Sequence, residues 1–80
     1  MFKAKEMWAF MSVGADGDEG LIGMKQGDVW LPFVATDGGR LDMLRDLSRK
    51  VAVEIKRPIY VVKFTNREEV ETIHGEEETE

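Results

Sequence analysis

The sequence predicts an α+β domain in which a small antiparallel or mixed β-sheet of about four strands, in the order β-β-β-α-β, packs on one long helix. Three observations support this fold class. The 80 residues are 42% apolar, which suits one hydrophobic core, and one long segment has the periodicity of a helix. The apolar segments around it are rich in β-branched and aromatic residues and are separated by glycine and aspartate turns. We expect a single domain over residues 1–74 and a disordered acidic tail over residues 75–80.

The first predicted strand covers residues 6–13 and is apolar on both faces. Alternation puts its aromatic residues on one side and its methionines on the other, so neither side suits water alone. The glycine and aspartate cluster of residues 14–20 predicts a turn. Residues 21–25 should then return as the second strand of a hairpin.

A second turn is predicted at residues 26–28, followed by a third strand over residues 29–35. Pro32 lies within this strand and has no N–H for a ladder hydrogen bond. We therefore expect an edge strand or a bulged strand.

The long helix should begin after a cap on Thr36 or Asp37. It should end by Lys56 or Arg57, because Pro58 disfavours helical geometry in the residue before it. Seven residues at helical spacing form the stripe that should face the sheet. They are Leu41, Leu44, Leu47, Ser48, Val51, Ala52 and Ile55.

Residues 58–64 are the strongest strand signal in the chain and are expected to form the central strand. Residues 65–68 match the Thr-x-x-Glu capping box, which predicts a short helix over residues 66–74 with Val70 and Ile73 on one side. The alternative is that the strand continues.

The two faces of the predicted sheet should differ in what covers them, because one helix can cover one face. Lys63 favours solvent, so its register is assigned to the face away from the helix. The covered face then carries Trp8, Phe10, Tyr60, Val62 and Phe64, and the other face carries Met7, Ala9, Met11, Val13, Ile59 and Val61. A large apolar patch usually marks an interaction surface. The predicted interaction residues are Met7, Met11, Val13, Ile59 and Val61, for a second copy or a host protein.

Charge is distributed unevenly along the chain, although the net value is −5. Residues 68–80 hold seven acids and no basic residue, whereas residues 1–67 hold nine acids and all 11 basic residues, a net of +2. Arg45, Arg49 and Lys50 form a candidate basic face on the helix, but interspersed acids favour a solvated surface over a nucleic-acid surface. The alternative hypothesis is a nucleic-acid-linked regulator or inhibitor that uses this basic helix or an acidic, nucleic-acid-mimicking tail.

No catalytic, metal or cofactor site is predicted. The chain has no cysteine, and the acids of the turn at residues 14–20 lack the spacing of a calcium loop. Gly38, Gly39 and Arg40 before the helix lack a complete phosphate-binding motif, and His74 is the single histidine. We therefore expect a protein that is not an enzyme.

The predicted function is a non-enzymatic protein-interaction module that forms a homo-oligomer. The lack of cysteine fits the cytoplasm, and the apolar run at residues 7–11 is too short for a signal peptide or a membrane span, so no membrane partner is expected. In format, the chain resembles small accessory proteins of phages and mobile elements.

Overall fold

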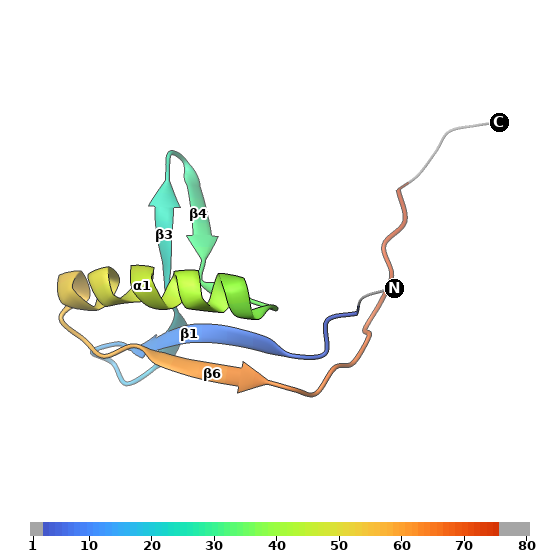
Figure 1. The fold of residues 1–80 in the computed structure, drawn as a ribbon, viewed down its shortest axis with the longest axis horizontal. Helices are drawn as coiled ribbons and strands as arrows, with labels where there is room; N and C mark the ends of the chain where they lie inside the picture. Colours follow the sequence, from blue (N-terminus) through green and yellow to red (C-terminus); the bar gives the residue numbers. More distant parts are fainter. Residues whose placement is uncertain (1–2, 76–80) are drawn as a thin grey trace.

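The fold, obtained as a computed structural model, is described for residues 3–75 and contains antiparallel strands in two sheets and a helix. The predicted α+β fold class is confirmed. The elements are β1 (Met7–Val13), β2 (Glu19–Leu21), β3 (Gly23–Gln26), β4 (Val29–Pro32), β5 (Val34–Ala35), α1 (Gly38–Ile55) and β6 (Tyr60–Phe64). Figure 1 shows α1 lying across one side of β1 and β6.

The central strand is β1, and the prediction that residues 58–64 take this place is wrong. Along one edge β1 pairs with β6, and along the other it pairs with β2 and β5. Within residues 3–75, β6 pairs with no strand other than β1, so its outer edge is free.

The strand that lies beside β1 is interrupted by a hairpin. Ile22 donates its N–H to the Phe10 carbonyl at 2.9 Å, and Phe10 donates its own N–H to the Phe33 carbonyl at 3.1 Å. Phe33 in turn donates to the Ile22 carbonyl at 2.9 Å, which closes the base of the hairpin. The two predicted strands at residues 21–25 and 29–35 therefore each divide, at Ile22 and at Phe33.

The inserted hairpin consists of β3 and β4 and extends past α1, away from β1 and β6 (Figure 1). Its two-residue turn begins with Gly27, whose φ of 64° matches the first central position of a type II′ turn. The predicted turn at residues 26–28 is thus confirmed. The Trp30 ring packs on Gly23, where a Cβ would lie 2.6 Å from Cε2 of the indole.

Both ends of α1 follow the capping signals. The Asp37 carboxylate accepts the N–H of Arg40 at 2.8 Å, and Lys56 ends the helix in the left-handed region with a φ of 57°. The Arg40 guanidinium also donates to the Val34 carbonyl at 3.0 Å, which ties the start of α1 to β5. The predicted helix and both of its boundaries are confirmed.

The core lies between α1 and the sheet. The rings of Phe10 and Phe33 meet edge to face with centroids 6.2 Å apart. The helix contributes Leu41 and Leu44 from the predicted stripe, while Ile55 at its end is exposed. The buried cluster comprises Phe10, Ile22, Phe33, Ala35, Leu41 and Leu44, with Trp8, Leu47, Val51 and Ile59 packed against it.

Residues 65–75 form neither a helix nor a strand, so both predictions for this segment are wrong. Val70 and Ile73 are 84% and 85% exposed, and the chain leads away from α1 and the strands (Figure 1). A helix of this length needs an apolar surface to pack against, and the body gives it none here. The predicted acidic tail lies outside the described residues from residue 76 onward, and the single domain over residues 1–74 stays a prediction.

Candidate functional site

The strand register reverses the predicted facing of β6. Residues directly opposite each other in antiparallel strands share a face. Phe10 pairs with Val61, whereas Met11 pairs with Tyr60. Ile59 and Val61 therefore lie on the helix side, and the prediction that they share a face with Met7 and Met11 is wrong. Tyr60, Val62 and Phe64, predicted on the covered face, lie on the opposite one.

The prediction was wrong because it placed Lys63 on the face away from the helix. In the structure Lys63 lies on the helix side, opposite Trp8. Its ammonium group contacts the Glu6 carboxylate at 3.1 Å and lies 5.9 Å from the centroid of the Trp8 ring. The side chains of Lys63 and Glu6 are each about half exposed. A lysine at the margin of a covered face keeps its ammonium group in water. The presence of Lys63 therefore does not show which face of β6 is covered.

The face of the sheet away from α1, here called the open face, has no second layer of described residues (Figure 1). Tyr60 is 47% exposed there, and Met7, Val13, Leu21 and Phe64 are also exposed. The open face consists of Met7, Ala9, Met11, Val13, Leu21, Val34, Tyr60, Val62 and Phe64. Three of the five predicted interaction residues, Met7, Met11 and Val13, belong to it.

A groove of about 290 Å³ runs between α1 and β6 and is here called the α1–β6 groove. Its lining is formed by Phe10, Arg45, Ser48, Arg49, Ala52, Ile59 and Val61. Ser48 is only 6% exposed, and its hydroxyl has no hydrogen-bond partner within residues 3–75. A buried hydroxyl without a partner is unusual, because its desolvation is not compensated. The groove thus combines an apolar floor, two guanidinium groups and an unpaired hydroxyl.

The candidate basic face divides between two surroundings. Arg45 and Arg49 line the α1–β6 groove, while Lys50 is exposed and does not. Arg45 forms an ion pair with Asp42 at 2.9 Å, and Arg49 forms one with Asp46 at 2.6 Å. These neighbouring acids offset much of the positive charge of the helix. The nucleic-acid hypothesis stays a prediction.

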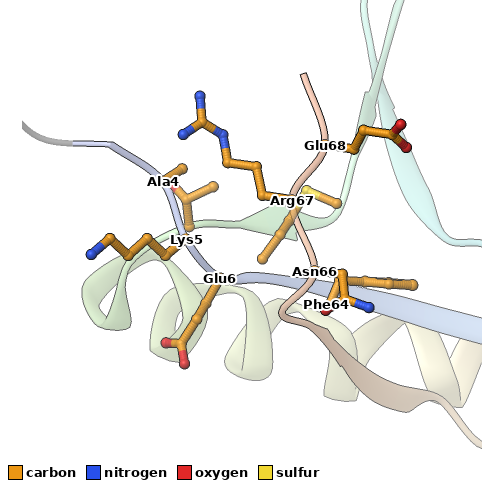
Figure 2. A pocket seen from close by; sticks show the side chains of 9 residues that line it. Ala4, Lys5, Glu6, Phe64, Asn66, Arg67 and Glu68 are labelled. Carbon is orange, nitrogen blue, oxygen red and sulfur yellow. The ribbon is translucent and has the colours of Figure 1, made fainter. Parts of the chain in front are cut away.

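A second pocket, of about 280 Å³, lies where the chain enters β1 and leaves β6. Figure 2 shows that Lys5, Glu6, Arg67 and Glu68 line it with their charged ends pointing in different directions. A ligand site needs a few polar groups that converge on one place. We therefore do not treat this pocket as a functional site.

Two weaker candidates have structural explanations. In the turn between β1 and β2, the Asp16 carboxylate accepts the N–H of Asp18 at 3.0 Å, as in an ordinary turn. At the start of α1, the Asp37 carboxylate already occupies an N–H that a phosphate would need. Among residues 3–75, no group of three histidine, cysteine, aspartate or glutamate side chains could hold a metal ion. No helix in this part of the chain is long and apolar enough to span a membrane.

The α1–β6 groove was not predicted from the sequence. A signal was present, because Ser48 is the one polar residue in the apolar stripe of the predicted helix. The position of Ser48 in the helix, however, does not show that Ile59 and Val61 lie across the groove from it. No protein-family model, curated protein or solved structure matches this chain.

Proposed function

We propose that this chain is a non-enzymatic protein-interaction module that self-associates through its open face. The observation that carries the proposal is that this face exposes large apolar side chains with no described layer on it. Contiguous apolar patches of this kind usually mark protein interaction surfaces. A cytoplasmic location and the likeness in format to phage accessory proteins belong to the same proposal and rest on the sequence alone.

A second copy of the same face is a suitable partner. Nine residues of the open face are uncharged, and the one charged residue that the register adds to this face is Glu19, opposite Val13 at its end. Interface cores are depleted in charged residues, and two sheets pack face to face through such apolar surfaces. The open face has no charge pattern that would require a partner of another kind. Two copies related by twofold symmetry would each cover the open face of the other.

The test changes the open face and leaves the core intact. In the double variant Tyr60→Lys with Phe64→Lys, both side chains are exposed on the open face, so the monomer should stay folded. Two buried ammonium groups would strongly oppose contact between the faces. We expect the wild type to form a dimer or a larger oligomer, and this variant to have the mass of a monomer. The mass in solution is measured by light scattering coupled to size exclusion. The measurement is made at about 0.5 M salt, which screens contacts that depend on charge.

The matched control is Met43→Lys with Val53→Lys, which adds the same two charges to exposed positions on α1. This control should keep the mass of the wild type. Circular dichroism checks that both variants are folded. An unchanged mass in the open-face variant, or a monomeric wild type at high protein concentration, would contradict the proposal.

A further inference from the structure

The exposed segment that follows β6 has the sequence pattern of a short helix, but it is not helical in the structure. Residues 65–68 match the sequence pattern of a capping box, and Val70 and Ile73 are spaced three residues apart. At about 100° per residue, these two side chains project on one side of a helix, with Glu69 on the flank next to Ile73 and Glu71 about 100° from Val70 in the other direction. In the structure the same residues belong to no helix or strand and are exposed, with Val70 and Ile73 at 84% and 85%. Only an apolar surface to pack against is missing.

The α1–β6 groove offers such a surface. Its accessible apolar lining is the exposed Val61 and the half-buried Ile59, next to the buried Phe10, and Arg45 and Arg49 add guanidinium groups. An amphipathic helix binds a groove by laying its apolar face on the floor, and its flanking charges then meet the rim. We propose that residues 65–74 of one copy form a short helix in the α1–β6 groove of a second copy.

Charge complementarity supports this occupant. Residues 65–74 include three acids and one arginine, Arg67, which precedes all three acids, and the groove lining includes two arginines and no acid. Arg45 and Arg49 each have donors beyond the one that contacts a neighbouring aspartate, and exposed pairs of this kind hold their partners weakly. The Ser48 hydroxyl can donate to a carboxylate of the incoming segment, which would give this buried group the partner it lacks.

The direction of the chain favours a second copy over the same copy. Ile59 and Val61 line the groove near the start of β6, whereas the segment leaves from its end at Phe64. Beyond that point the segment leads away from α1 (Figure 1). Two copies can exchange their segments reciprocally, which closes a twofold dimer. This contact goes beyond the proposed function because it uses a different surface and does not require the open face.

The first test uses the exposure of the segment. It is carried out on the full chain with Tyr60→Lys and Phe64→Lys, so that the open face makes no contribution, and at low salt. We expect a concentration-dependent dimer and a rise in helical circular dichroism as it forms. Adding Val70→Asp and Ile73→Asp should weaken the dimer at least about tenfold, because both apolar anchors are lost. Both side chains are almost fully exposed in the free chain, so the change should leave the body folded.

The second test exchanges charges in the same background. One variant carries Arg45→Glu and Arg49→Glu, and the other carries Glu69→Lys and Glu71→Lys. Each variant alone should be monomeric, because its groove and its segment have the same sign. An equimolar mixture should restore a dimer, since each groove then meets a segment of opposite charge.

Three results would overturn this inference. Equal dimerisation with and without Val70→Asp and Ile73→Asp would show that the segment is not in the contact. A helical signal that does not change with protein concentration would place the segment in the groove of its own chain. A mixture that stays monomeric would leave the groove to a foreign partner. None of these results bears on the open face, which is tested at high salt in the wild-type background.

Discussion

The two faces of the sheet are made by alternate residues of the same strands, yet they differ in what covers them. Phe10 on the helix side of β1 is 1% exposed, whereas Tyr60, on the opposite side of β6, is 47% exposed. Both faces are apolar, although one is enough to build the core against α1. The apolar residues of the helix side build the core, whereas those of the open face are left exposed. The exposed set is the basis of the proposed self-association.

The largest expected effect is on the covered face. Phe10→Ala removes a fully buried ring that packs against Phe33, and should lower the free energy of unfolding by about 3–5 kcal/mol. In a domain this small, that is a large share of the total stability. Urea unfolding followed by circular dichroism measures the loss. Val53→Ala on the exposed side of α1 is the control and should change little; a Phe10→Ala variant as stable as this control would place the core elsewhere.

The next effect is a gain at the edge of the covered face. Ser48→Ala removes a buried hydroxyl without a hydrogen bond and improves helix propensity, so the free energy of unfolding should rise by about 1–2 kcal/mol. The midpoint of urea unfolding of the monomer reports this gain. A decrease would mean that the hydroxyl makes a stabilising hydrogen bond in the free chain. The same variant should bind residues 65–74 of a second copy less tightly.

The smallest effect is expected on the open face. Tyr60→Thr replaces an exposed aromatic side chain with a β-branched one, and both residue types suit a strand, so the free energy of unfolding of the monomer should change by less than about 0.5 kcal/mol. Unfolding must be measured at a concentration where the chain is monomeric. A loss comparable to that of Phe10→Ala would remove the distinction between the two faces.

The parts of the fold that the sequence predicted have local signals. The cap at Asp37 and the proline at position 58 act on their immediate neighbours, so both limits of α1 could be predicted. The turn at Gly27 depends on one backbone conformation that glycine adopts easily. The apolar stripe of the helix needs no knowledge of its partner either.

The register of β6 has no such local signal. Apolar residues occupy both parities of the strand, so Lys63 was the only basis for a choice, and the ion pair with Glu6 allows it on the helix side. Three residues of the open face and two residues of the α1–β6 groove were exchanged as a result. The open face was therefore predicted as a feature of the sheet, but its members on β6 were not.

The insertion of the β3–β4 hairpin between Ile22 and Phe33 has an evolutionary consequence. These two residues are hydrogen-bonded to each other and to Phe10, so residues 23–32 could be shortened, lengthened or replaced without breaking the ladder beside β1. The hairpin also exposes Val29, Trp30 and Leu31. A lineage could therefore change what this arm contacts, by insertion and deletion alone, while the rest of the domain stays under separate selection for folding.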